Sequence, residues 1–377
     1  MGKTSLLLSD YIIDGCRMEA TPGMMLELAC GRTPHGGEEG LESIIDESID
    51  PSPEGTFSPG KITAFACATS SSVRRDIPLA HIGPYTRMVA AGALVESLWQ
   101  CGHYRLNDLQ INMRWIWNSR GTGSAAAFYN SVESVCDYLD SLGVAMGGYS
   151  VEEGERCSIE ASVSLSGDAS GNDDELPFFS ELPFRTGNPR MTSERKCPSV
   201  SLGDSGSWLI YIPFDTCAPR LGGSLLSEVE GIPGGTAPAI ADPDYFIDCY
   251  EVVREMVEDG IISSGITVGD GGLMKALRSY IPRGKGIDAQ LGGISGSWGE
   301  KDIVKILFAE IPGVIIEIND TDYDYLDAEL LLQDVAYYPI GHITDRFEGV
   351  RASMSEAGDI SGILLSLMSG AASEGED

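Results

Sequence analysis

The stretch that decides the fold is Ser264-Gly265-Ile266-Thr267-Val268-Gly269-Asp270-Gly271-Gly272-Leu273, an apolar run that ends in a glycine turn. The residues from 261 to 268 predict a strand, and the glycines that follow predict a tight turn before a short helix that ends near Ile281. Asp270 places a carboxylate among glycines, which suits a hard metal ion beside phosphate oxygens. This stretch therefore predicts a strand, a glycine turn and a helix, with the turn close to a bound anion.

A second glycine segment, Arg220-Leu221-Gly222-Gly223-Ser224, precedes it in the chain. Two glycines before a hydroxyl allow backbone N–H groups to come close to an anion. Either segment by itself is equally typical of an ordinary turn, so their order, spacing and neighbours must decide.

Strands and helices are expected to alternate around these two segments. In the carboxy-terminal part we expect strands at 208–213, 314–318 and 338–343, with helices at about 243–259 and 322–333. Earlier in the chain, a strand at 109–117 lies between helices at about 84–98 and 125–142, and Gly143 suits the left-handed position after the second helix. Further strands are expected at 5–16, 144–146 and 157–166. The pattern predicts an α+β fold with α/β-like alternation.

Polar, proline-rich sequence divides the chain. We predict an amino-terminal domain over 1–185, a linker over 186–205, a carboxy-terminal domain over 206–350 and a frayed tail over 351–377. Within the first domain, residues 31–60 are rich in Gly, Pro, Ser and acids, so we expect an exposed acidic loop there.

The composition excludes several function classes. Fifty-seven acidic against 25 basic residues give a net charge of −32 over 377 residues. This charge repels nucleic acid and anionic membranes, and it favours solubility, life at high salt or docking to a basic protein. No apolar run approaches the ~20 residues that span a bilayer, and the amino terminus does not resemble a signal peptide, so an intracellular, cytoplasmic protein is expected. The nine cysteines form no C-x-x-C pair and are expected to be reduced.

Taken together, these segments resemble the carboxy-terminal, aminoimidazole-ribonucleotide-synthetase-like (PurM-like) half of phosphoribosylformylglycinamidine (FGAM) synthase. The family's R-L-G-G-[ST] resembles Arg220–Ser224, its S-G-H-D-V-S-D-G-G-L resembles Ser264–Leu273, and its L-F-A-E-x-P-G is similar to Leu307–Gly313. The resemblance covers about residues 4–345. It implies an amino-terminal sheet domain that pairs across a pseudo-twofold axis, followed by an α/β domain.

The resemblance also implies a site for ATP or ADP with magnesium. The family's L-A-D, E-A-L-T-N and D-G-G-L segments carry its magnesium ligands, and residue by residue these match Asp10, Glu96, Gln100 and Asp270. Glu96 and Gln100 are four apart on an expected helix, so both can face one ion. The nucleotide contacts implied are Arg220, Gly222, Gly223, Ser224, Gly271 and Gly272.

Several positions depart from the family pattern. The family's G-K-D-S is Gly148-Tyr149-Ser150-Val151 here, and its H-D before the glycine turn is Ile266-Thr267. A site without that lysine, histidine and aspartate is poorly equipped for phosphoryl transfer, so no catalytic residue is assigned.

Two functions are therefore open. One is a non-catalytic Mg-nucleotide-binding or protein-interaction scaffold, for which gammaherpesvirus tegument proteins similar to FGAM synthase are a precedent, with a nuclear or virion location. The other is a component of an ATP-dependent FGAM synthase, a ligase of purine biosynthesis that needs a partner half and a glutaminase. Expected partners are a second copy, a second PurM-like half, or a host or basic protein.

Overall fold

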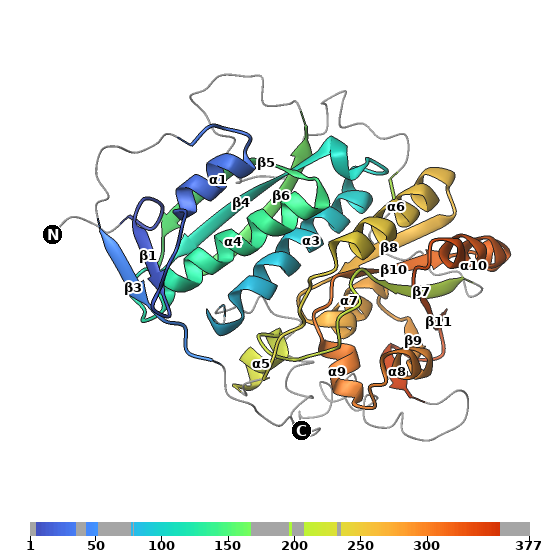
Figure 1. The fold of residues 1–377 in the computed structure, drawn as a ribbon. Helices are drawn as coiled ribbons and strands as arrows, with labels where there is room; N and C mark the ends of the chain where they lie inside the picture. Colours follow the sequence, from blue (N-terminus) through green and yellow to red (C-terminus); the bar gives the residue numbers. More distant parts are fainter. Residues whose placement is uncertain are drawn as a thin grey trace. The chain divides into compact units, whose positions relative to one another are not determined.

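The computed structural model describes residues 5–34, 43–51, 77, 79–166, 196–197, 207–231 and 235–354. Within them helices and strands mix in an α+β fold, as the sequence predicts (Figure 1). The described residues form two compact units. Unit 1 holds those between 5 and 51, between 77 and 94, and between 104 and 166, and unit 2 holds 95–103 and those between 196 and 354. The predicted linker over 186–205 lies almost wholly outside the described residues.

A three-stranded sheet with the order β5-β4-β6 forms the larger part of unit 1. The central strand β4 (Leu109–Trp117) pairs with β5 (Ala145–Glu153) in parallel and with β6 (Ser158–Leu165) antiparallel. Every second residue of β4 is buried, which is the period of two of a strand with one face in the core, and the strand expected at 109–117 is confirmed.

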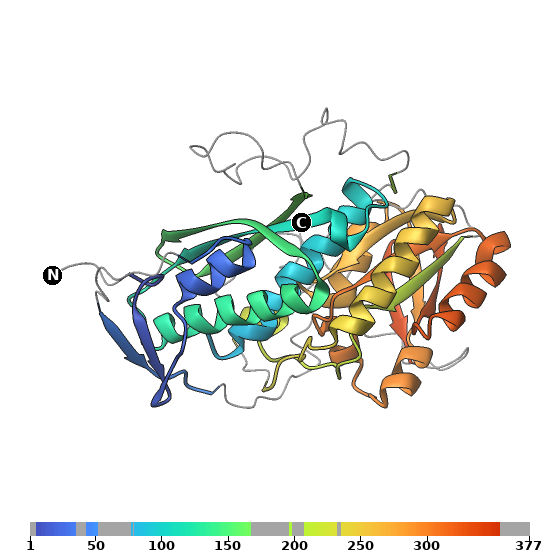
Figure 2. The same cartoon turned by 45° about the horizontal axis from the view of Figure 1, so that its top comes forward.

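Two helices lie along this sheet. Figure 2 shows α1 (Pro22–Ala29) and α4 (Ser124–Leu142) side by side over it. Trp115 and Trp117 of β4 both meet the ring of Phe128 edge-on, with centroids 6.1 and 5.6 Å apart. Gly143 follows the last residue of α4 and is left-handed as predicted, with φ 65°. Burial of large aromatic rings between strand and helix thus fixes the core of unit 1.

A small second sheet, with the order β2-β1-β3, corrects part of the expected acidic loop. Strand β1 (Asp10–Ile13) forms a hairpin with β2 (Cys16–Arg17), so the predicted strand over 5–16 is shorter than expected. Strand β3 (Ile44–Glu47) pairs in parallel with β1 and buries Ile45. The expectation of a loop is therefore wrong for 44–47, because parallel pairing orders a segment whose local composition opposes order. Residues 35–42 and 52–60 lie outside the described residues.

Unit 2 is built on a six-stranded sheet with the order β12-β9-β11-β7-β10-β8. The expected strands at 208–213, 261–268, 314–318 and 338–343 are confirmed, and two further strands were not foreseen. The strands are β7 (Trp208–Pro213), β8 (Ile262–Val268), β9 (Gly286–Gln290), β10 (Gly313–Ile318), β11 (Tyr338–Thr344) and β12 (Gly349–Ser353). Because β12 includes residues 351–353, that part of the predicted frayed tail is ordered; residues 355–377 lie outside the described residues.

Helices cover this sheet, and those expected at 243–259 and 322–333 are confirmed. They are α5 (Leu225–Glu230), α6 (Pro243–Asp259), α7 (Gly272–Tyr280), α8 (Gly292–Trp298), α9 (Ile303–Phe308) and α10 (Tyr323–Leu332). The long helix α3 (Ile82–Gln100) belongs to unit 1 up to Leu94 and to unit 2 beyond it. Short 3₁₀ turns lie at Leu79–His81, Leu106–Asp108 and Asp320–Asp322.

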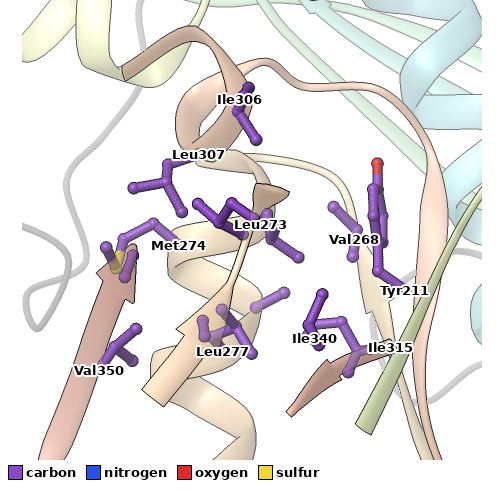
Figure 3. Close-up of a cluster of buried hydrophobic side chains, with 14 of the residues drawn as sticks. Tyr211, Val268, Leu273, Met274, Leu277, Ile306, Leu307, Ile315, Ile340 and Val350 are labelled. Carbon is purple, nitrogen blue, oxygen red and sulfur yellow. The ribbon is translucent and has the colours of Figure 1, made fainter. Parts of the chain in front are cut away.

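The main core of unit 2 lies between the sheet and helices α7 and α9. Figure 3 shows Leu273, Met274 and Leu277 of α7 among side chains of the strands. These three residues are at i, i+1 and i+4, the spacing that places side chains on one side of a helix. The core therefore fixes α7, and with it the glycine turn at its start.

Among the described residues, none of the helices has both the length and the apolar character that a membrane span requires.

Candidate functional site

A buried carboxylate, Glu310, ties the two glycine segments of unit 2 together. Its Oε1 accepts hydrogen bonds from the backbone N–H of Leu225 and the backbone N–H of Gly271, both at 2.8 Å. Leu225 begins α5 and Gly271 directly precedes α7, so one carboxylate neutralises the positive ends of two helices. Glu310 is 5% exposed, and it comes from the segment after α9 that resembles L-F-A-E-x-P-G.

The turn before α7 requires glycine at two successive positions. Gly271 and Gly272 have φ of 76° and 63°, in the left-handed region that other residues avoid. A Cβ on Gly272 would lie 2.7 Å from the carbonyl oxygen of Ala309 and 2.8 Å from that of Leu307. The start of α7 can approach the end of α9 this closely only because the side chain is absent.

The first glycine segment is held by neighbouring backbone. Gly222 donates its N–H to the carbonyl of Thr236 at 2.9 Å, and a Cβ on Gly222 would lie 2.3 Å from the carbonyl carbon of Thr236. Gly223 has φ 69°, and the Ser224 hydroxyl accepts a hydrogen bond from the N–H of Ser227 at 3.2 Å. Ser224 is therefore the amino-terminal cap of α5.

The predicted nucleotide contacts thus gather in one unit but differ in exposure. Gly222, Ser224, Gly271 and Gly272 are buried, whereas Arg220 and Asp270 are exposed. In this region Glu310 accepts from the N–H groups of Leu225 and Gly271, and Gly272 donates to the carbonyl of Gly269 at 2.8 Å. The assignment of these residues to nucleotide binding stays a prediction.

Glu96, a predicted magnesium ligand, lies in a hydrogen-bonded chain within unit 2. Its Oε2 accepts from the Thr267 hydroxyl at 2.5 Å, and its Oε1 accepts from the Gln100 amide at 2.9 Å. The Trp99 indole N–H donates to the same Thr267 hydroxyl at 3.0 Å. Gly265 admits this indole ring, since a Cβ there would be 2.5 Å from it. Both carboxylate oxygens of Glu96 are therefore engaged by side chains of the same unit.

Thr267 and Trp99 were not among the predicted site residues. Thr267 stands where the family motif resembling this strand has an aspartate, and two carboxylates facing each other would repel. The threonine in place of the family's aspartate was the one feature of the sequence that could have indicated this contact, because a hydroxyl can donate a hydrogen bond to the carboxylate of Glu96. Trp99 carried no such signal.

The other predicted metal ligands have separate surroundings. Asp10, in unit 1, accepts a hydrogen bond from the guanidinium of Arg17 across the β1–β2 hairpin. Asp270 belongs to unit 2 and is exposed. Among the residues that the structure describes, no group of three or more His, Cys, Asp or Glu side chains is arranged to hold a metal ion. The magnesium assignment is therefore carried by the resemblance alone and stays a prediction.

Tyr149, at the position of the family's G-K-D-S lysine, is tied to a local ion pair in unit 1. Its hydroxyl donates to Glu27 Oε1 at 2.7 Å, and Glu27 accepts from Arg32 at 2.6 Å. The Arg32 guanidinium carbon lies 5.8 Å from the centre of the Tyr149 ring. Burial, and then the hydrogen bond to Glu27, raise the pKa of Tyr149 to about 12. A tyrosine supplies no positive charge in place of the family's lysine.

A second buried carboxylate fixes strand β8. Ser264 donates to Glu317 Oε2 at 2.7 Å and lies 2.5 Å from the hydroxyl of Tyr280, and all three residues are buried. Burial raises the pKa of Tyr280. This network anchors the strand that leads into the glycine turn to β10 and to the end of α7.

Comparisons with known proteins agree with the resemblance in the sequence. No family model matches the chain. It is 26% identical over 262 residues to a probable FGAM synthase, chloroplastic/mitochondrial, of Arabidopsis thaliana, which is 69% of this chain and 17% of that protein. With the FGAM synthase of Drosophila melanogaster it shares 23% identity over 261 residues, 64% of this chain and 18% of that one. The chain thus spans less than a fifth of the length of these curated relatives.

Solved structures show a distant likeness. The match to the structure of Thermotoga maritima PurL complexed with ATP covers 75% of this chain and 41% of the PurL chain, with 13% identity and a TM-score of 0.48. The match to Escherichia coli HypE, a hydrogenase maturation protein, covers 74% of this chain and 77% of the HypE chain, with 12% identity and a TM-score of 0.43.

Proposed function

We propose that this chain, which is similar in sequence to FGAM synthases, is a non-catalytic half of that architecture and serves as a protein-interaction scaffold. The observation that carries the proposal is the hydrogen bonding of Glu96. A carboxylate that the resemblance assigns to magnesium accepts instead from Thr267 and Gln100. Hydrogen bonds within the chain thus engage both oxygens of Glu96, which supports a use of the fold that does not need the reaction.

The chemistry of the neighbouring positions supports this proposal. Phosphoryl transfer depends on cations and metal ions that neutralise charge on the phosphate oxygens. Tyr149 and Ile266 stand where the family has a lysine and a histidine, and neither is cationic. At the glycine segments, the N–H groups of Leu225 and Gly271 are directed at Glu310, so the anion that they bind is the chain's own.

The alternative is a component of an ATP-dependent FGAM synthase that binds ATP or ADP with magnesium and works with a partner half and a glutaminase. Two observations favour it: the similarity to FGAM synthases, and the exposed Asp270 beside a turn that needs glycine at 271 and 272. In this alternative, Asp270 holds the metal and the glycine segments line the nucleotide.

Calorimetric titration with ATP, with and without magnesium, separates the two proposals. A scaffold gives no saturable magnesium-dependent heat at millimolar ATP, and wild type and Asp270→Ala behave alike. Asp288→Ala is the matched control, because Asp288 is an exposed aspartate elsewhere in the same unit. Magnesium-dependent binding that Asp270→Ala abolishes and Asp288→Ala preserves, together with FGAM formation when a partner half and a glutaminase are added, refutes the scaffold.

A further inference from the structure

Helix α10 of unit 2 carries an apolar stripe that faces solvent. The described residues include seven large hydrophobic side chains that are exposed, and three of them, Tyr325, Leu331 and Leu332, lie on this one helix. Leu331 and Leu332 are 66% and 78% exposed. Exposed apolar side chains are ordinary where they are scattered singly, but three of them within eight positions of one helix form a patch.

The spacing shows that the stripe is distinct from the side of α10 that packs on unit 2. Leu326 and Leu330, at i and i+4, are fully buried. Tyr325 and Leu332 are seven residues apart, and Ala328, also exposed, lies between them at i+3. With 3.6 residues per turn these positions share one side of the helix, and Leu331 borders them. Helix α10 is therefore apolar on two sides, one of which the fold uses.

Carboxylates surround this stripe. The Tyr325 hydroxyl donates to Asp259 Oδ2 at 3.2 Å, at the end of α6, which contacts α10 (Figure 1). Partial burial and then the carboxylates of Glu329, Asp259 and Glu255 raise the pKa of Tyr325. Asp324 adds an exposed carboxylate on α10 itself.

No basic side chain on these two helices offsets this charge. The sequence contains no Lys or Arg between Lys305 and Arg346, a range that includes all of α10. Arg254, the one basic residue of α6, is 4% exposed and forms ion pairs with three glutamates of its own helix, Glu251, Glu255 and Glu258. The stripe is therefore apolar at its centre and negative at its rim.

We propose that the α10 stripe (Tyr325, Ala328, Leu331 and Leu332) docks a basic amphipathic helix of a partner protein. Apolar residues at i, i+3 and i+7 are the anchors by which helices pack against one another, and a rim of carboxylates selects lysine and arginine beside them. A second copy of this chain would bring two acidic rims together, and nucleic acid or an anionic membrane would be repelled. The partner is therefore a basic protein segment, and this surface requires no nucleotide.

The test uses the full chain and a synthetic peptide of leucine and lysine, with leucines at i, i+4 and i+7, in a fluorescence anisotropy titration. The peptide is expected to bind wild type, and the double variant Leu331→Ser/Leu332→Ser should bind at least about tenfold more weakly, since burial of one leucine is worth about a factor of ten. The matched control is Leu28→Ser, which changes an exposed leucine of α1 in unit 1 and should leave binding unchanged. A companion peptide with glutamate in place of lysine should not bind.

A second variant reports on the rim alone. Asp324→Asn/Glu329→Gln retains the leucines and should weaken binding of the lysine peptide mainly at low salt, because screening already removes much of this attraction at high salt. Thermal unfolding of each variant shows that it is folded. Equal affinity of wild type and the Leu331→Ser/Leu332→Ser variant, equal binding of the two peptides, or no binding by wild type overturns the proposal. So does self-association of the chain that the leucine variant abolishes, which would assign the stripe to a second copy.

Discussion

Replacement of Glu310 by glutamine removes one negative charge from the junction of the two glycine segments and retains the size of the side chain. Oε1 of Glu310 accepts two N–H groups at 2.8 Å in a position that is 5% exposed. A hydrogen bond to a charged acceptor is worth about 1 kcal/mol more than one to a neutral acceptor. Loss of a charge at a helix amino terminus costs about 0.3–1 kcal/mol for each helix.

Together these terms predict that Glu310→Gln lowers the free energy of unfolding by about 2–4 kcal/mol, with little dependence on salt because the group is buried. Urea unfolding followed by circular dichroism measures this change. Glu300→Gln is the matched control. Glu300 also accepts two backbone N–H groups, from Lys301 and Asp302 at 2.9 Å, but its side chain is 23% exposed, so the effect of the substitution should be smaller. Equal effects of the two substitutions, or a change below about 0.5 kcal/mol in Glu310→Gln, would refute the assignment of Glu310 as the tie between the segments.

Three further substitutions test neighbouring features. Gly272→Ala should lower the free energy of unfolding by about 3 kcal/mol or more, because the backbone is left-handed and the new Cβ clashes with two carbonyl oxygens. Gly296→Ala in α8 is the control and should be neutral or stabilising, because nothing lies within 4 Å of its new Cβ. Thermal unfolding compares the two variants. Thr267→Val should lower the free energy of unfolding by about 1–3 kcal/mol, because the Trp99 indole and Glu96 lose a hydrogen-bond partner, and Thr267→Ser should restore most of this stability. Urea unfolding measures both variants, and a Thr267→Val protein as stable as wild type would contradict this network. The N–H of Asp302, and then the Lys305 side chain, lower the pKa of Glu300, so its contribution to stability is present above the unfolded pKa and lost as pH falls through the folded pKa. Glu300→Gln should therefore flatten the loss of stability below about pH 4.5, and the same acid slope in both proteins would contradict that.

The sequence by itself determined the elements whose signal is local. Strand β4 follows from the largely alternating apolar and polar residues over Leu109–Trp117, and α6 follows from apolar spacing between Asp242 and Gly260. Both patterns depend on neighbours within a few positions, so no knowledge of the rest of the chain was needed. The glycine turn at 269–272 was identified in the same way, because positive φ angles at Gly271 and Gly272 are a property of the residue type.

The tertiary structure alone decided how these elements are joined. Strand β3 forms within a segment of disfavoured composition because its backbone pairs with β1, 34 residues away at Asp10 and Ile44. Glu310 accepts from N–H groups 39 and 85 residues distant, and Thr267 donates to Glu96 across 171 residues. Such contacts leave no periodic trace in the sequence, because a hydrogen bond needs only one donor and one acceptor in place. The sequence is thus compatible with glycine segments that bind a phosphate or with glycine segments that bind a carboxylate of the same chain. Only the folded chain shows that the N–H groups of Leu225 and Gly271 donate to Glu310.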